Sequence, residues 1–416
     1  MSLALMSLIA LLIVIAISCV LPFNVGLMSI AFTFVVGVLL GGIKTATILK
    51  EFPVSLFMIL VGVTYLFGIA QVNGTLDRLC NTSIRLVRGK ASMMPIVFFV
   101  LGFFLSAIGP GAIPVTALLA PPAMAVAHKM KINPFLMALF VVNGANAASL
   151  SPITPSGAIA VGLIKNLGMP DISWQLFSNT AIANIVIQVI AYFMFGGLAL
   201  WRRDSKTVAN SGDSSIQAEP IRYERQHILS LLGIAVLLFG ALVLKLDVGL
   251  LGIVIGVILT VLGCADESKV LKSMPWGTIL MVCGVTVLVG LMSQTGGMKM
   301  FIDLMASISS PSTLTLVATF IPGVISAYSS STGVVLPAFL PLVPGLVDTV
   351  GGDLVSVFSG VCLGAFLVDA SPLSTLGALI LGAAAEDVDK RKLFNQLLAW
   401  GLSMSVVGAV IAWLLF

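Results

Sequence analysis

Residues 149–157 read Ser-Leu-Ser-Pro-Ile-Thr-Pro-Ser-Gly, residues 369–377 read Asp-Ala-Ser-Pro-Leu-Ser-Thr-Leu-Gly, and these two stretches decide the fold. Each interrupts an apolar segment, 134–166 or 353–386, that is too long to cross a membrane once. Proline, glycine and hydroxyl residues are tolerated at membrane depth where the opened backbone lines a cavity inside the protein. We therefore predict a broken transmembrane helix over each segment.

The two stretches belong to a repeated unit. Ser151-Pro152 matches Ser371-Pro372 at an offset of 220 residues (371 minus 151). Nearer the start of each half, Gly62-Val-Thr64 matches Gly284-Val-Thr286 at an offset of 222 residues (284 minus 62). A nearly constant offset across glycine, proline and serine positions favours duplication over chance, and duplicated halves are typical of secondary transporters.

Each half contains a second irregular segment. Residues 93–127 hold apolar runs split by Ser106-Ala-Ile-Gly-Pro-Gly111, and residues 313–347 hold runs split by Ser326-Ala-Tyr-Ser-Ser-Ser-Thr-Gly333. Such Gly/Ser/Pro interruptions end helices and form tips. We predict a re-entrant hairpin over each segment.

The composition places the chain in a membrane. Apolar residues make up 59% of it and charged residues 9%, and its mean hydropathy is +1.14. Such a chain cannot cover a water-facing surface with polar side chains. The fold class is predicted to be an all-α polytopic membrane protein with two inverted repeats. Each repeat holds a re-entrant hairpin and a broken transmembrane helix, which gives about ten spans plus two hairpins.

The basic residues predict the orientation. We expect a first inverted repeat over 1–201, a cytoplasmic linker over 202–226 and a second inverted repeat over 227–416. With the linker in the cytoplasm, 16 of the 21 Lys and Arg residues lie on that side and five lie outside. This predicts a bacterial inner (cytoplasmic) membrane protein with both termini outside, whose first hairpin opens from the cytoplasm and whose second opens from outside. His128 and His227 fall in predicted cytoplasmic loops and are expected to be solvated.

The hairpins and breaks together predict an anion site. Two hairpins that dip from opposite faces towards two unwound segments bring four broken backbones to the bilayer midplane. Helix N-termini there present free N–H groups and partial positive charge, while hydroxyl and carbonyl oxygens suit a small hard cation. No Lys, Arg or His lies in these segments, so we expect helix dipoles, hydroxyls and co-bound cations to meet a carboxylate.

The same residues resemble a known family. The runs Ser-Ala-Ile-Gly-Pro-Gly and Leu-Leu-Ala-Pro-Pro-Ala-Met-Ala-Val-Ala within 98–127, and the run from Asn143 to Gly157, resemble the malonate/dicarboxylate carriers called MatC. More distantly, both halves are similar to the divalent anion/sodium symporters of the ion transporter superfamily. That resemblance implies substrate contacts at Ser330-Ser331-Thr332 and Ser371, a homodimer, and a transport domain that rides on a scaffold. It departs at Pro110-Gly111-Ala112, where backbone N–H groups would have to replace the family's side-chain donors.

Candidate site residues come from the clustered breaks and tips. Asp369 stands out because an acid at membrane depth is costly unless it is paired, protonated or cation-bound, and its counterpart in the first half is Ser149. The substrate-binding candidates are Pro110, Gly111, Ser151, Thr154, Ser330, Ser331, Thr332, Ser371 and Ser374. The cation-binding candidates are Ser106, Asn143, Asn146, Ser149, Ser326, Asp369 and Ala370; Asn143 and Asn146 are equally open to bridging helices.

The function predicted is a secondary active transporter that imports a small, malonate-like dicarboxylate by cation symport, with Na+ as the coupling ion and an elevator mechanism. The alternative is a proton-coupled or proton-exchanging anion carrier of the same superfamily, with Asp369 as the proton carrier. An ATP-driven pump is excluded because no Gly-x-x-x-x-Gly-Lys-Ser/Thr motif exists. A channel and an intramembrane protease fit less well. We expect no enzyme activity, no cofactor, no metal beyond the coupling cation, and no nucleic-acid partner.

Overall fold

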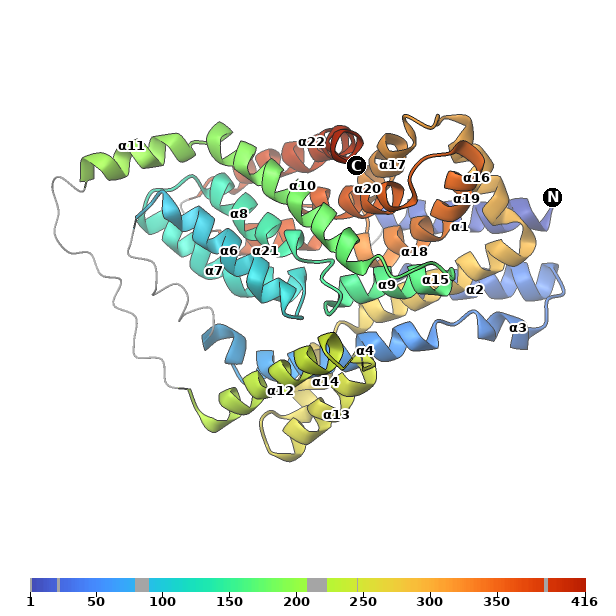
Figure 1. Cartoon of the computed structure of the whole chain (residues 1–416), viewed down its shortest axis with the longest axis horizontal. Coiled ribbons are helices and arrows are strands. Elements are labelled where there is room, and N and C mark those ends of the chain that lie inside the picture. Colours follow the sequence, from blue (N-terminus) through green and yellow to red (C-terminus); the bar gives the residue numbers. More distant parts are fainter. Residues whose placement is uncertain (1, 21–22, 79–89, 208–222, 245, 385–387) are drawn as a thin grey trace.

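The computed structural model describes residues 2–20, 23–78, 90–207, 223–244, 246–384 and 388–416. Throughout these residues the regular structure is helical (Figure 1). The elements of the first half are α1 (Leu3–Val20), α2 (Val25–Thr33), η1 (Phe34–Leu40), α3 (Thr45–Lys50), α4 (Val54–Val72), α6 (Met93–Ala107), α7 (Ala112–Lys129), α8 (Pro134–Ala147), α9 (Pro155–Asn166), α10 (Ser173–Met194) and α11 (Gly197–Thr207).

The second half follows from α12. Its elements are α12 (Arg225–Leu242), α13 (Val248–Val261), α14 (Glu267–Ser273), α15 (Trp276–Thr295), α16 (Gly297–Ser307), α17 (Leu314–Ser326), η2 (Ser331–Val335), α18 (Leu336–Phe339), η3 (Leu340–Leu342), α19 (Val343–Val350), α20 (Leu354–Leu367), η4 (Val368–Ala370), α21 (Thr375–Ala383) and α22 (Lys390–Leu415). Most of the predicted linker, 208–222, lies outside the described residues.

Several helices have the length and composition of membrane spans. In the described part of the chain, six helical segments are long and apolar enough to cross a membrane, and seven shorter apolar helices accompany them. The prediction of an all-α polytopic membrane protein is therefore confirmed. The inverted arrangement of the two repeats stays a prediction, which the packing of the two halves supports.

The third long helix of each half packs against the second helix of the other half. Helix α4 crosses α13, and α15 crosses α2. At the first crossing, a Cβ atom on Gly62 would lie 1.9 Å from the carbonyl oxygen of Gly249. At the second, a Cβ on Gly284 would lie 2.1 Å from the carbonyl oxygen of Gly26. The glycines let the backbones touch, and the same contact is made twice with the halves exchanged.

The hairpins also pack in equivalent ways. Helix α6 lies along α8, and α17 lies along α20. Figure 1 shows α6, α7 and α8 side by side at one end of the molecule, while α16, α17 and α19 gather towards the other. A Cβ on Gly144 of α8 would lie 2.5 Å from the carbonyl oxygen of Phe99, and a Cβ on Gly364 of α20 would lie 2.1 Å from that of Thr319. The offset between the two pairs is again 220 residues (364 minus 144).

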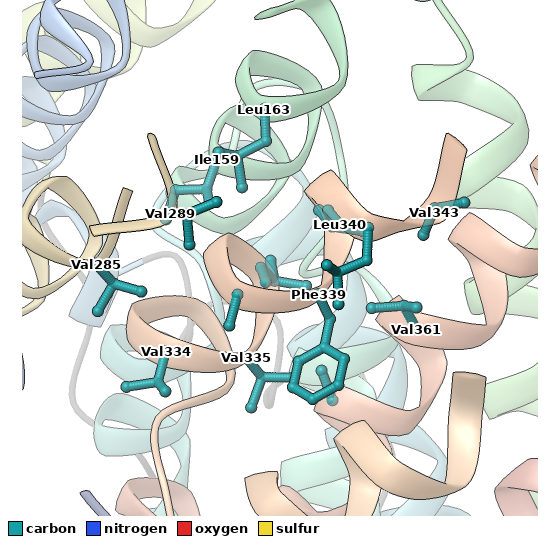
Figure 2. Packing of buried hydrophobic residues seen from close by; sticks show 14 of the residues in the cluster. Ile159, Leu163, Val285, Val289, Val334, Val335, Phe339, Leu340, Val343 and Val361 are labelled. Carbon is teal, nitrogen blue, oxygen red and sulfur yellow. The ribbon is translucent and has the colours of Figure 1, made fainter. Parts of the chain in front are cut away.

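The two halves share a hydrophobic core. Figure 2 shows Val334, Val335 and Phe339, which follow the second tip, packed among side chains of α9, α15 and α20. Ile159 of α9 comes from the first half and is buried in the same cluster. The returning arm of the second hairpin is thus fixed against both halves.

His227 corrects one expectation from the sequence. It was predicted to be solvated, but it is fully buried. Its Nδ1 accepts a hydrogen bond from the N–H of Glu224 (2.9 Å), and its Nε2 lies 2.9 Å from the carbonyl oxygen of Asn73. Because Asn73 ends α4, this ring ties the start of α12 to the end of α4.

Candidate functional site

The first break, residues 148–154, is held by its own hydroxyl groups. Ser151 Oγ donates to the carbonyl oxygen of Ala107 in the first hairpin (2.8 Å). Thr154 Oγ1 accepts from the N–H of Gly157 (3.0 Å), which caps α9, and is bonded to the carbonyl oxygens of Ser149 and Ser151. These bonds satisfy backbone groups that an ended helix leaves open.

The second break, residues 368–374, makes equivalent bonds. Ser371 Oγ lies 3.5 Å from the carbonyl oxygen of Ala327 in the second hairpin. Ser374 Oγ donates to the carbonyl oxygen of Asp369, as Thr154 does to Ser149. The matching bonds support the repeat. They also give Ser151, Thr154 and Ser371 a structural use for their hydroxyl groups.

Tip 1, residues 109–111, is apolar. Gly109 (φ +140°) lies under the ring of Phe67, so close that a Cβ would be 2.0 Å from Cε2 and Cζ. Gly111 (φ +81°) precedes α7 and packs beside Pro155. Only glycine adopts these backbone conformations freely, and at Gly109 the ring of Phe67 also leaves no room for a side chain.

Tip 2, residues 329–332, is rich in hydroxyl groups. Ser330 Oγ accepts from the N–H of Gly333 (3.0 Å). Ser331 Oγ donates to Oδ1 of Asp369 (2.7 Å), and Ser326 Oγ lies 2.9 Å from Ser331 Oγ and 2.6 Å from the carbonyl oxygen of Ala365. Tip 2 is therefore bonded directly to the second break.

Both tips, the second break and the helix ends that flank the first break, at Asn146 and Pro155, border one cavity of about 270 Å³. None of the described residues that line it is Lys, Arg or His, and Asp369 is the acid among them. The lining residues are Leu60, Thr64, Phe67, Gly68, Gln71, Pro110, Gly111, Ala112, Ile113, Pro114, Ala117, Asn146, Pro155, Ser156, Ile159, Ser273, Pro275, Thr278, Ile279, Ser329, Ser330, Ser331, Thr332, Phe366, Asp369, Ser374, Thr375 and Leu376.

The cluster around Asp369 has more acceptors than protons. Ser331 donates its one hydroxyl proton in the hydrogen bond to Asp369. Its Oγ can therefore act towards a ligand only as an acceptor. Ser374 Oγ likewise spends its proton on a carbonyl oxygen. Carboxylate, hydroxyl and carbonyl oxygens gathered in this way suit a hard cation rather than an anion.

Other groups around the cavity offer donors. Helices α7 and α21 pack against each other, their first residues line the cavity, and no side chain of the described residues caps either N-terminus. The side chains of Ser156, Thr332 and Thr375 form no hydrogen bond with another described residue. Uncapped helix N-termini and free hydroxyl groups are the donors that a carboxylate needs.

Half of the predicted site residues reach the cavity. Those that line it are Pro110, Gly111, Asn146, Ser330, Ser331, Thr332, Asp369 and Ser374. Those that lie behind its lining are Ser106, Asn143, Ser149, Ser151, Thr154, Ser326, Ala370 and Ser371. Of the second group, Ser326 contacts the lining residue Ser331, and Ser149 Oγ lies 3.3 Å from Oδ1 of the lining residue Asn146.

Two predicted residues carry unpaired polar atoms. Ser106 Oγ is fully buried without a partner among the described residues. Its counterpart in the second half, Ser326, is bonded to Ser331, and the residue equivalent to Ser331 in the first half is Gly111. Asn143 donates to Gln188 Oε1 (2.7 Å), while its own Oδ1 is unpaired within the described chain. Buried polar atoms are usually bonded, so an unpaired one indicates a missing partner. Asn146 instead bridges to the carbonyl oxygen of Phe366 (2.9 Å).

The sequence interpretation missed the wall formed by α4 and the start of α15. Leu60, Thr64, Phe67 and Gln71 repeat at helical spacing and line the cavity together, and Thr278 faces it from α15. Gln71 is polar in an otherwise apolar span, and this signal was available in the sequence.

Comparisons with known proteins agree with this architecture. Residues 1–149 match the sequence family described as dicarboxylate carrier protein MatC N-terminus. No curated protein matches the chain significantly in sequence. The solved YdaH transporter of Alcanivorax borkumensis is similar in structure at 15% sequence identity, covering 88% of this chain and 87% of that one with a TM-score of 0.61. MtrF of Neisseria gonorrhoeae, described with a class of antimetabolite efflux pumps, is similar at 14% identity, covering 91% and 84% with a TM-score of 0.51.

The fold and the family match at residues 1–149 support a multi-pass membrane transporter rather than an enzyme. The match over residues 1–149 confirms the resemblance to the MatC dicarboxylate carriers seen in the sequence.

Proposed function

We propose that the protein is a secondary active transporter that imports a small dicarboxylate together with Na+. One observation carries the proposal: the acceptor-rich cluster around Asp369 and the uncapped N-termini of α7 and α21 border the same cavity. The first arrangement suits a cation and the second suits a carboxylate, so each ligand stabilises the other. The family match at residues 1–149 supports a dicarboxylate as the substrate, and the choice of a malonate-like one rests on the resemblance described in the sequence.

The cation is held by the second half in this proposal. Asp369, Ser331, Ser326 and the carbonyl oxygen of Ala365 supply its ligands. Ser106, Asn146 and Ser149 mark a second cation site at the equivalent place in the first half, where the buried hydroxyl of Ser106 has no partner among the described residues.

Charge sets the stoichiometry. Moving a dianion into a cell with a negative interior costs about 2.3 kcal/mol per charge per 100 mV, or roughly 4.6 kcal/mol at that potential. No basic side chain lines the described cavity to neutralise the substrate in transit. At least two monovalent cations therefore accompany each dianion, and a third makes uptake draw on the membrane potential.

Protons are the alternative coupling ion. Asp369 is buried and shares its Oδ1 with Ser331, so it can carry a proton into the same cavity. This version keeps the substrate and the architecture and changes only the cation.

The mechanism that fits is alternating access by an elevator. The hairpins and broken helices form the moving part, and α4 with α13 and α2 with α15 form the frame. We place the protein in the bacterial inner membrane as a homodimer. The distribution of basic residues supports its orientation there, with the central loop cytoplasmic and both termini outside. The homodimer itself rests on the distant resemblance to sodium-coupled anion symporters.

Transport by the purified full chain in proteoliposomes tests the proposal. Uptake of labelled malonate is measured under separately imposed Na+, pH and voltage gradients. We expect uptake to require an inward Na+ gradient and to show a Hill coefficient above one for Na+. Dependence on a pH gradient alone would favour the proton alternative. A reversal potential that follows the dianion alone, with neither cation acting, would overturn symport.

A further inference from the structure

The two ends of the cavity differ in chemistry although they come from equivalent parts of the repeat. Where the second half places Ser331-Thr332-Gly333, the first half places Gly111-Ala112-Ile113. Ile113 lines the cavity, and 42% of its residue surface is exposed. A large apolar side chain held open to a cavity indicates a surface that an apolar ligand group covers.

Neighbouring residues continue this apolar surface. Pro114 and Ala117 follow Ile113 on α7, and Phe67 reaches the same end from α4, where its ring rests on Gly109. We call Phe67, Ile113, Pro114 and Ala117 the apolar half of the cavity. Thr64 on the same wall adds no free donor, because its hydroxyl is bonded to the carbonyl oxygen of Leu60 (2.7 Å).

Unsubstituted malonate has nothing to place against this surface. Its carboxylates are served by Thr332, Thr375 and the N-termini of α7 and α21, and its one methylene group is too small to cover the apolar half. The cavity, at about 270 Å³, lies just below the range of roughly 300–1,000 Å³ typical of pockets for larger small molecules. It therefore has room for more than a three-carbon dianion.

We propose that the preferred substrate is a dicarboxylate that carries an apolar group on its carbon chain, and that Phe67 limits the size of that group. The inference rests on the proposed function, because it takes the carboxylates to bind at the donors described above. Each methylene group buried against the apolar half should raise the affinity about four-fold until the space beside Phe67 is filled.

Competition against labelled malonate in proteoliposomes tests this. The competitors are malonate itself, methyl-, ethyl-, butyl- and benzylmalonate, and hydroxymalonate as a polar control of methyl size. We expect the half-inhibitory concentration to fall about four-fold from malonate to methylmalonate and again to ethylmalonate, while hydroxymalonate gains nothing. Labelled ethylmalonate should itself be taken up, which separates transport from inhibition.

The Phe67→Ala variant tests the size limit. Its readout is the ratio of the half-inhibitory concentrations for benzylmalonate and methylmalonate, which should fall at least ten-fold as the larger group gains space. Phe57→Ala is the matched control, since Phe57 lies on the same helix, packs with Phe52 and does not line the cavity. If Phe67→Ala does not fold, Ile113→Ala enlarges the same end of the cavity and is read in the same way.

The outcomes separate the two proposals. Uptake of malonate with no gain for any alkylmalonate over hydroxymalonate would overturn the apolar-group inference and leave dicarboxylate transport standing. Failure of every dicarboxylate, substituted or not, to be taken up or to compete would overturn the proposed function itself. An unchanged ratio in Phe67→Ala and Ile113→Ala, beside a clear gain for ethylmalonate, would reject Phe67 as the size limit.

Discussion

Ser331 Oγ lies 2.7 Å from Oδ1 of Asp369, so a hydrogen bond joins tip 2 directly to the acid of the second break. Tip 2 can move away from the break only by giving up this bond. Cation binding at Asp369 and the position of tip 2 are therefore linked through the hydroxyl group of Ser331.

Substitutions at tip 2 should affect Na+ binding and dicarboxylate binding separately. Ser331→Ala removes the hydroxyl that faces Asp369, and a hydrogen bond to a charged group contributes about 1.5–3 kcal/mol. We expect the Na+ concentration for half-maximal uptake to rise about ten- to hundred-fold. Thr332→Val keeps the shape but removes a free donor, so it should mainly raise the KM for the dicarboxylate. Wild-type uptake curves for both variants, at normal folded yield, would reject tip 2 as part of the site.

Asp369→Asn keeps the shape of the side chain and removes its charge. Because the carboxylate is the one acid that lines the described cavity, we expect a large loss of Na+ affinity, or of pH dependence if protons are coupled. Initial uptake is measured across Na+ concentrations at fixed pH and across pH at fixed Na+. If neither dependence changes, Asp369 has a structural role alone.

Ser106→Ala tests the unpaired hydroxyl. An unsatisfied buried polar group costs about 1–3 kcal/mol, so in Na+-free buffer the variant should unfold at the same temperature as the wild type or higher. It should also lose part of the stabilisation that Na+ gives and show a Hill coefficient near one. Ser326→Ala is the matched comparison, because that hydroxyl is bonded and its loss should lower the unfolding temperature without Na+. A lowered unfolding temperature for Ser106→Ala would show that the hydroxyl has a partner.

Substitution of glycine by alanine should be equally destabilising at the two helix crossings. Gly62→Ala and Gly284→Ala place a methyl group about 2 Å from a backbone carbonyl oxygen of the crossing helix, and overpacking of this kind costs about 1–3 kcal/mol or more. We expect both variants to lose folded yield and thermal stability in detergent. Gly382→Ala, in α21 with nothing within 4 Å of the added methyl, should be neutral or slightly stabilising. A clear difference between Gly62→Ala and Gly284→Ala would weaken the equivalence of the two crossings.

His227→Ala should destabilise the protein without affecting the site directly. The change removes two partly buried hydrogen bonds, to the N–H of Glu224 and to the carbonyl oxygen of Asn73, and each contributes about 0.5–1.5 kcal/mol to stability. Thermal unfolding in detergent measures the loss. Gln226→Ala, next to it on α12 and bonded only at the exposed side chain of Glu224, serves as the control. Equal unfolding temperatures for the two variants would contradict the bridging role of His227.

The positions where the helices break could be predicted from the sequence, whereas the residues that face one another across the cavity could not. Ser151-Pro152 and Ser371-Pro372 carry helix-ending chemistry that is local in the sequence, so the ends of α8 and α20 follow from it. Phe67 is an ordinary aromatic residue in an apolar span, and which way it faces depends on how α4 packs.

The use of each hydroxyl group also needed the structure. The sequence placed Ser331 among the substrate candidates, whereas its proton goes to Asp369, 38 residues further on (369 minus 331). The unpaired state of Ser106 is different. Glycine stands at 111 where serine stands at 331, so the first half lacks one of the partners that Ser326 has in the second half. An alignment of the two halves shows the exchange of serine for glycine. The bond between Ser326 and Ser331 in the structure shows that this exchange removes a hydrogen-bond partner.

The exchanged glycine crossings have a consequence for how the protein is made. During synthesis, α2 and α4 enter the membrane before α13 and α15 exist, so the first half has no partner for the backbone surfaces at Gly26 and Gly62. The surface at Gly62 stays unpacked until α13 has been made, and the surface at Gly26 stays unpacked until the ribosome has passed the end of α15. The two halves therefore do not mature as independent bodies, and the crossings between them are completed one after the other, late in translation.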